Sequence, residues 1–395
     1  MSKSLADMLA PKSVLRDHAA TPTPRVTNME LFFDLVYVFT IIQLSHFLLH
    51  HQSLTGALEA VMLFAAVWWT WNYTAWATNW LDPDHKAGRI VMVVLMACAL
   101  GMAIAIPQAF KDRARLFAGA YVLMSLIRPF YMALAFRGQR MGRNYLQLGL
   151  WSALSGVFWI AGALLPQHRI ALWAAAVIVD YAAPYAGFWL PGLGATSMAS
   201  WPLKGLHLLE RNQLIFIIAL GESVLLLGGT LVSEPLETGT IVAAVIGFLI
   251  IVCLWWIYFG RTFHEGEHAF EHASDHSQIA RAGLAYAHGI LVGSAIVVAA
   301  SIELIIAHPH DAVHLPTVLI AVLGPAIFLL GNAIFRRVMS RRVPVSYLLA
   351  AIALAGVGAA CHYAHLSGLW LGAGVLAVLV VVAAMAGAGR PAGEA

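Results

Sequence analysis

The chain has 395 residues, of which 61% are hydrophobic and only 11% charged, and its net charge is +3. Soluble domains carry about 25% charged residues, so this composition excludes an ordinary cytosolic enzyme and a disordered chain. No basic stretch is dense enough to follow a phosphate backbone, which excludes a nucleic acid as a partner. Because so few residues are charged, the position of each charge becomes the most informative feature of the sequence.

Apolar runs of about 20 residues recur from residue 29 to residue 388, and a run of this length crosses a bilayer as an α-helix. The runs are continuous rather than alternating, which favours helices over a β-barrel. A polar arm, 1–28, precedes them, and a short tail, 389–395, follows. We therefore predict an all-α transmembrane helical bundle in contact with the lipid bilayer, with about twelve spans. The predicted spans are 29–49, 56–78, 90–107, 115–136, 145–165, 170–190, 207–232, 240–260, 283–306, 316–335, 345–363 and 368–388.

Lysine and arginine residues orient this predicted bundle. Of the 23, eighteen fall on the side of the N-terminus, four fall on the opposite side, and one, Arg128, lies inside a span. By the positive-inside rule, this asymmetry places both termini in the cytoplasm. It also favours an even number of spans, because one span more or fewer would scramble the alternation.

A weak internal repeat divides the membrane region 29–388 into two possible halves, 29–190 and 207–388. Asp34 and Glu222 each lie 33 or 34 residues before a pair of adjacent tryptophans. Two halves of six spans each would be parallel repeats related by an axis along the membrane normal, as in some transporters. The alternative is chance similarity between two apolar sequences.

Two carboxylates near the start of the first span, Glu30 and Asp34, are candidate binding groups. A charge at the centre of a bilayer costs at least about 2.5–3.5 kcal/mol, so it is retained mainly where it is paired or functional. Glu30 and Asp34 share a helix face because they are four residues apart, and together they could hold a proton, a cation or an arginine. For Glu30 the alternative is a helix-capping role.

Further charged residues lie in later spans. Glu222 falls in the middle of its span, and Arg211 lies about 16 Å earlier along the same helix, too far for a direct pair. An ion pair of Arg128 with Glu222 or Asp180 is therefore the structural alternative to a functional site. The predicted ion- or substrate-binding residues are Asp34, Glu222, Glu30, Asp180, Arg128, Glu210 and Arg211.

Four histidines recur at a spacing of four in a polar loop, 261–281, that follows the eighth span. On a helix, side chains at this spacing project together and could share a divalent metal such as Zn²⁺, Ni²⁺ or Cu²⁺. The alternatives are a solvated cytoplasmic loop and a pH-sensing segment. This histidine ladder consists of His264, His268, His272 and His276.

Three motifs stand out from the apolar background. The first span opens with ELFFDLV (30–36), FIIALGES (216–223) lies mid-chain, and the eighth span closes with WWIYF (255–259). Together they resemble the low-temperature-requirement protein A (LtrA) family of bacterial integral membrane proteins, over roughly residues 24–386. The resemblance implies a multi-pass protein of the bacterial plasma (inner) membrane, and it supplies no catalytic residues.

These features favour a transporter or channel for a small solute or ion, in which the intramembrane carboxylates are proton or cation sites. One alternative is an intramembrane enzyme acting on a lipid or isoprenoid, with a metal at the histidine-rich cytoplasmic rim. Another is a non-catalytic membrane protein that acts in the cell envelope or in cold stress. Recognised catalytic motifs are absent from the sequence, which favours the transporter or channel but leaves the enzyme open as an alternative.

Overall fold

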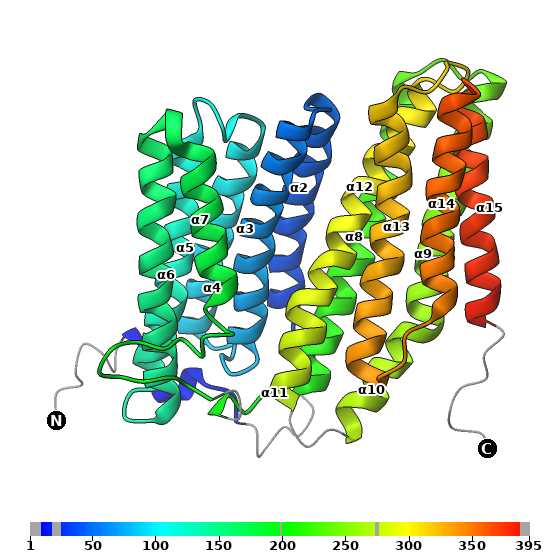
Figure 1. The fold of residues 1–395 in the computed structure, drawn as a ribbon. Coiled ribbons are helices and arrows are strands. Elements are labelled where there is room, and N and C mark those ends of the chain that lie inside the picture. The colour runs from blue at the N-terminus through cyan, green and yellow to red at the C-terminus, as the bar shows by residue number, and fades with distance from the viewer. Residues whose placement is uncertain (1–8, 18–24, 198–199, 273–275, 388–395) are drawn as a thin grey trace. The chain divides into compact units, whose positions relative to one another are not determined.

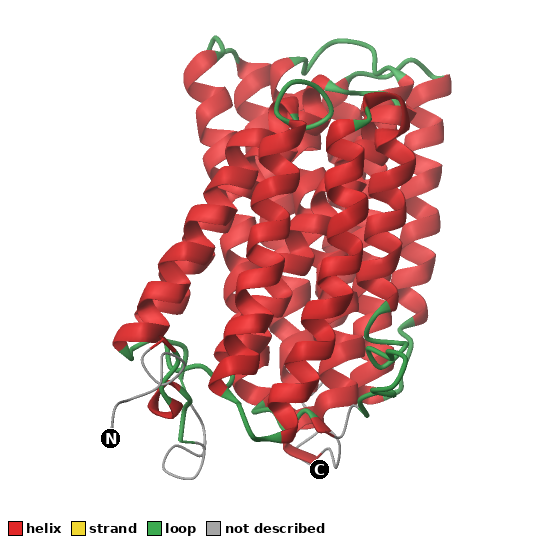
Figure 2. Ribbon diagram, turned by 90° about the vertical axis from the view of Figure 1, so that its left-hand side faces the viewer, coloured by secondary structure: helices red, strands yellow, loops and turns green. Residues whose placement is uncertain are grey.

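The structure is a computed structural model, and it describes residues 9–17, 25–197, 200–272 and 276–387 (Figure 1). These residues form helices joined by loops, and none of them belongs to a β-strand (Figure 2). The predicted all-α fold is therefore confirmed. Of the predicted arm, only 9–17 and 25–28 are described, and the predicted tail 389–395 lies outside the described residues.

The chain divides into two compact units, and the division falls inside α8 (Gly205–Ser233), between Arg211 and Asn212. The first unit contains the chain up to Phe47 together with Leu54–Arg211 and the short segment Asp275–Gln278. Its helices are α2 (Asn28–His50, whose last turn belongs to the second unit), α3 (Leu54–Thr78), α4 (Lys86–Ala105), α5 (Ala114–Ala135), α6 (Arg140–Leu164), α7 (Arg169–Ala182) and the first two turns of α8.

The second unit contains most of the chain after Arg211. Two of its helical runs include a π-helical segment, a geometry that recurs at functional sites. The segments are Tyr258–Thr262 and Ala280–Ala287. The α-helices of this unit are the remainder of α8, α9 (Thr238–Ile257), α10 (Phe263–His272), α12 (His288–Ala307), α13 (Leu315–Ser340), α14 (Val345–Tyr363) and α15 (Gly368–Gly387). The short α11 (His276–Ile279) belongs to the first unit except for its last residue.

Among the described residues, eleven helical runs are long and apolar enough to cross a membrane, and they correspond to eleven of the predicted spans. The remaining one, predicted at 170–190, is shorter than expected. It forms α7, which has 14 residues and so extends about 21 Å, whereas the apolar core of a bilayer is about 30 Å thick. Pro184 explains the early end, because proline lacks an amide donor and disfavours helix in the residue before it. The parallel repeat and the cytoplasmic termini stay predictions.

An aromatic core joins α5, α6 and α7 in the first unit. Phe117 and Tyr121 lie one turn apart on α5 and contact Trp159 of α6, and Trp173 of α7 completes the cluster. All four side chains are buried, and their ring centroids are 4.7–5.9 Å apart. Such ring contacts stabilise the helix packing beyond the contribution of apolar burial alone. They therefore fix the positions of polar groups on the same helices.

In the second unit, α12 and α13 approach closely at Gly324. A Cβ atom placed on Gly324 would lie 2.9 Å from Cγ2 of Val298 and 3.0 Å from its backbone nitrogen. Small residues at helix contacts are typical of membrane bundles, where close packing of backbones replaces the hydrophobic drive of water. Gly324 therefore permits a close approach of α12 and α13 that the Cβ atom of an alanine would prevent.

Candidate functional site

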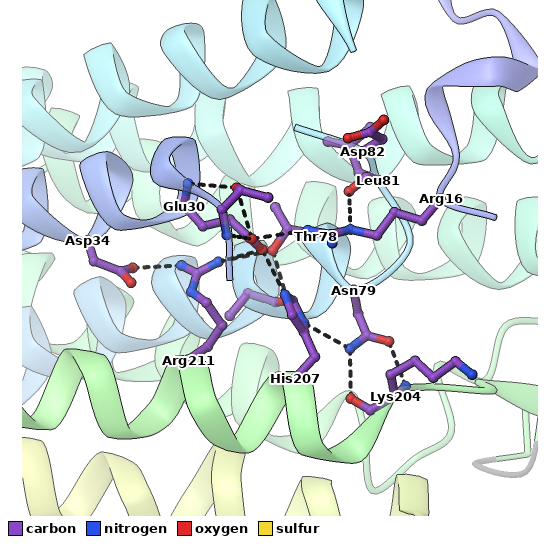
Figure 3. Close-up of polar contacts among 12 residues, drawn as sticks. Arg16, Glu30, Asp34, Thr78, Asn79, Leu81, Asp82, Lys204, His207 and Arg211 are labelled. Carbon is purple, nitrogen blue, oxygen red and sulfur yellow. Dashed lines mark hydrogen bonds and ion pairs between the residues drawn. The ribbon is translucent and has the colours of Figure 1, made fainter. Parts of the chain in front are cut away.

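A buried cluster of acidic and basic side chains lies in the first unit, where α2, α3 and the beginning of α8 meet (Figure 3). α2 presents Glu30 and Asp34 on one face, since residues four apart stack along a helix. α8 presents His207 and Arg211 in the same way, and none of these four side chains is more than 1% exposed. We call these residues, together with Arg16, the Arg211 cluster.

Arg211 connects the two carboxylates. Its Nη2 donates to Oδ1 of Asp34 at 2.6 Å, and its Nη1 donates to Oε1 of Glu30 at 3.1 Å. Nη1 also donates to Oγ1 of Thr78 at 3.1 Å. The planar guanidinium suits this arrangement because its donors point along fixed, separate directions. One buried cation is thus shared between two buried anions.

Glu30 has further partners on its other oxygen. Oε2 accepts from Nη2 of Arg16 at 3.0 Å, and also from the backbone N and Oγ1 of Thr27 at 2.9 and 3.1 Å. The backbone N of Glu30 donates to Oγ1 of Thr27 at 3.3 Å, which completes a reciprocal capping box at the start of α2. The capping role weighed for Glu30 is therefore present, together with pairing to two arginines.

The ring of His207 is oriented by Asn79. Nδ2 of Asn79 lies 3.3 Å from Nδ1 of His207, and Asn79 is itself held by hydrogen bonds to the backbone of Lys204. Because the amide donates to Nδ1, a neutral ring carries its proton on Nε2. That nitrogen lies 3.2 Å from Oε1 of Glu30, within ion-pair range. Apart from His207, the cluster contains two carboxylates and two guanidiniums, whose formal charges balance.

Asp34 is the carboxylate of the cluster whose hydrogen bonding is incomplete, and Nε of Arg211 and Nε2 of His207 are likewise buried without a hydrogen-bond partner among the described residues. Its Oδ1 accepts from Arg211 and from Nε1 of Trp71, the latter at 2.8 Å. Its Oδ2 is buried and has no hydrogen-bond partner among the described residues. A buried carboxylate oxygen in this state is costly. It is the atom of the cluster where a proton or a small cation would be stabilised.

Comparison with known proteins identifies the family. The sequence pattern described as "Bacterial low temperature requirement A protein (LtrA)" matches residues 25–384. The chain belongs to the LtrA family. An uncharacterized protein of Rhizobium meliloti (strain 1021) is 36% identical to it over 335 residues, which cover 83% of this chain and 81% of that relative. No solved structure matches it. The predicted family is thus confirmed, and the LtrA chain is a multi-pass membrane protein whose apolar helices contact lipid.

Two other predicted site residues of the LtrA chain, Asp180 and Arg128, lie in the first unit but do not pair. Asp180 accepts from Oη of Tyr121 at 2.6 Å and from Nε1 of Trp159 at 3.3 Å. Arg128 instead donates to the carbonyl of Thr70. The Asp180–Arg128 ion pair, which was one form of the structural alternative, is not formed among the described residues, because Asp180 faces α5 at Tyr121, which is seven residues, or about 10 Å, from Arg128 along that helix.

The remaining predicted residues lie apart from the Arg211 cluster. Glu222 is buried in the part of α8 that belongs to the second unit. Glu210, beside Arg211, is half-buried and forms no ion pair with a described residue. The structure therefore brings together Glu30, Asp34 and Arg211 out of the predicted set.

Several contributors to this site were not predicted from the sequence, among them His207, Trp71, Thr78 and Arg16. His207 had a detectable signal, since it lies four residues before Arg211, as Glu30 does before Asp34. Trp71, Thr78 and Arg16 had none, because their contacts come from tertiary packing of residues that are individually ordinary for their positions. From the sequence, Arg16 was interpreted only as one of the basic residues that orient the bundle.

The histidine ladder of the LtrA chain is helical where it is described. His264, His268 and His272 lie exposed on α10, and His276 begins α11 after three residues that lie outside the described ones. The rings of His268 and His272 stack with centroids 4.2 Å apart, and Nδ1 of His272 bonds to the carbonyl of His268 at 2.9 Å. No three described His, Cys, Asp or Glu side chains are grouped to hold a metal. The metal site stays a prediction.

An ion pair connects α10, which carries three of the ladder histidines, to α13. Glu265 accepts from Nε and Nη2 of Arg336 at 2.8 and 2.7 Å, and from Oγ of Ser340 at 3.1 Å. The Arg336 side chain is 5% exposed. This bidentate pair is shielded from water, unlike the i,i+3 contact of His264 with Glu267, where both side chains are exposed.

We expect Glu265→Ala to loosen α10 from α13. Arg336 would lose its partner while buried, and hydrogen bonds to charged groups contribute about 1.5–3 kcal/mol each. Amide hydrogen exchange over residues 263–272 is therefore expected to quicken by about tenfold or more. Glu267→Ala is the matched control and is expected to leave exchange unchanged. Equal exchange in the two variants would contradict this role of the pair.

Proposed function

We propose that this LtrA chain moves a small solute or ion across the bacterial plasma membrane, with the Arg211 cluster as its proton- or cation-binding site. The observation that supports the proposal is the buried Oδ2 of Asp34, which has no hydrogen-bond partner among the described residues. Ionisable groups inside membrane spans are retained mainly where they pair, line a pathway or relay protons. Asp34 pairs through one oxygen and leaves the other available.

The cluster allows a proton or a cation to bind at Oδ2 of Asp34 without leaving Arg211 unpaired. When Asp34 is ionised, Arg211 bridges it to Glu30. Binding of a proton or a cation at Oδ2 would weaken the bond to Arg211, which would keep Glu30 and Thr78 as partners. Two arrangements of one buried arginine are the kind of bistable element that alternating access requires.

The position of the cluster along the helices fits access from one side of the membrane. Glu30 lies in the first turn of α2, Thr78 is the last residue of α3, and His207 lies in the first turn of α8. These are the ends that the basic residues assign to the cytoplasm. Glu222, which is buried in the second unit, stays a separate candidate carboxylate.

Proton-coupled flux in vesicles tests the proposal. We expect the purified full chain, reconstituted in liposomes with pyranine inside, to change the internal pH when a Na⁺, K⁺ or chloride gradient is imposed. Protein-free vesicles under the same gradients give the background rate. A protein-dependent pH change under at least one gradient would support the proposal, and background rates under all three would contradict it.

A further inference from the structure

A segment that precedes the first span is docked against the first unit. Residues 9–17 include a short 3₁₀-helix, Lys12–Val14, and the side chains of Ala10 and Val14 are completely buried. Nη1 of Arg137, which follows α5, donates to the carbonyl of Ala10 at 2.7 Å. We call residues 9–17 the N-terminal strap. The strap and the Arg211 cluster belong to the same compact unit.

Two backbone hydrogen bonds join the strap to the loop that follows α3. The backbone N of Arg16 donates to the carbonyl of Trp80 at 2.7 Å, and the backbone N of Asp82 donates to the carbonyl of Val14 at 2.8 Å. Thr78, the last residue of α3, takes part in the hydrogen bonds of the Arg211 cluster. The strap is therefore anchored directly beside the end of α3 that contributes to the cluster.

Arg16 brings a positive charge from the strap into the Arg211 cluster (Figure 3). Its Nη2 donates to Oε2 of Glu30 at 3.0 Å, and its Nε donates to the carbonyl of Leu81 at 3.1 Å. The Arg16 side chain is 12% exposed, whereas the other members of the cluster are at most 1% exposed. Arg16 is therefore the member of the cluster that lies nearest to water.

Undocking of the strap would change the charge of the cluster. With Arg16 in place, the formal charges of Glu30 and Asp34 are balanced by those of Arg16 and Arg211. Without Arg16, two buried carboxylates share one guanidinium, and an uncompensated buried charge is costly. The cluster without the strap therefore favours the uptake of a proton or a small cation.

We propose that the N-terminal strap is a gate of the Arg211 cluster, and that Arg16 is a tethered cation that competes with the bound proton or cation. The docked strap closes the cluster and neutralises it. The undocked strap opens it toward the side that the basic residues assign to the cytoplasm. This regulation rests on the proposed function, and by linkage a bound cation weakens the docking of the strap.

Labelling of a cysteine at position 78 tests whether the strap controls access to the cluster. Thr78→Cys places a thiol beside Arg211, where a sulfonated, water-soluble maleimide reaches it only after the strap undocks. Adding Arg16→Gln is expected to raise the labelling rate of residue 78, followed by mass spectrometry, by about tenfold, since it removes a hydrogen bond between charged groups from the docked state. Arg16→Lys should give an intermediate rate.

Arg25→Gln is the matched control for the labelling. It removes an equal charge close to the start of α2, but Arg25 is exposed and forms no ion pair with a described residue. We expect it to leave the labelling rate of Thr78→Cys unchanged.

A disulfide that locks the strap provides a second test in a chain that keeps Arg16. Leu15 and Leu81 face each other in an antiparallel bridge, and the Cα separation of such pairs, about 4.5–5.5 Å, suits a disulfide. In the variant Leu15→Cys with Leu81→Cys, oxidation is expected to slow amide exchange of Thr27 and Glu30, whose amides donate within the cluster. The expected factor is about tenfold or more, and reduction should reverse it.

Equal labelling rates in Arg16→Gln and Arg25→Gln would overturn the gate. Amide exchange that is the same in the oxidised and reduced lock would overturn it as well, and the lock decides alone if Arg16→Gln does not fold. Neither measurement requires transport. A lack of flux in vesicles would therefore contradict the proposed transport function, while labelling and exchange still decide whether the strap closes the cluster.

Discussion

Arg211→Ala is expected to destabilise the protein by about 3–5 kcal/mol, the usual cost of removing one partner from a buried ion pair. The substitution leaves Glu30 and Asp34 facing each other without the cation that bridges them. The loss is large against the total stability of a typical domain, which is about 5–15 kcal/mol. It is measured as a fall in apparent Tm in detergent at a fixed scan rate, because large proteins often unfold irreversibly.

A charge-balanced variant distinguishes the effect of leaving two carboxylates without their cation from the effect of lost packing. Arg211→Met combined with Glu30→Gln and Asp34→Asn removes the buried charges together, and neutral replacements of this kind are often tolerated. We expect this triple variant to be more stable than Arg211→Ala. Arg211→Lys should be intermediate, because it keeps the charge but not the fork of donors. A triple variant no more stable than Arg211→Ala would contradict the account of the cluster.

Asp34→Asn is expected to reduce the protein-dependent flux to the rate of empty vesicles while the protein still folds. The amide oxygen of asparagine can accept from Trp71 and Arg211 as Oδ1 of Asp34 does. The side chain then has no second oxygen to bind a proton or a cation. Flux and apparent Tm are measured on the same preparation, so that a loss of folding is seen separately from a loss of flux.

Glu210→Gln is the matched control for this experiment. It also neutralises a carboxylate in the first turns of α8, but that residue is half-buried and forms no ion pair with a described residue. We expect it to transport at the rate of the wild type. Wild-type flux in Asp34→Asn would contradict the assigned role of Asp34.

The spans of this protein are predictable because a membrane-spanning helix requires a continuous apolar run of about 20 residues. Eleven predicted spans match helical runs of the structure. The mismatch at α7 arises from local chemistry, since the apolar run continues past Ala182 whereas Pro184 stops the helix. Apolar length alone therefore overestimated this span.

The residues of the site could be predicted only where the sequence pattern that marks them lies within one helix. Glu30 and Asp34 stand out because a spacing of four places two rare intramembrane acids on one helix face. Their partner could not be chosen from the sequence, since Arg211 lies 177 residues after Asp34 and which helices are neighbours is decided by packing. The same limit explains why the sequence could not decide the partners of Asp180 and Arg128, which hydrogen-bond to Tyr121 and Thr70 respectively.

The most direct test of the central claim is to observe the proton on Asp34 itself. Infrared difference spectra between high and low pH show the carbonyl stretch of a carboxylic acid when a buried carboxylate takes up a proton. We predict such a band in the wild type, its loss in Asp34→Asn and its retention in Glu210→Gln. Identical bands in the wild type and in Asp34→Asn would contradict the assignment of Asp34 as the exchanging group.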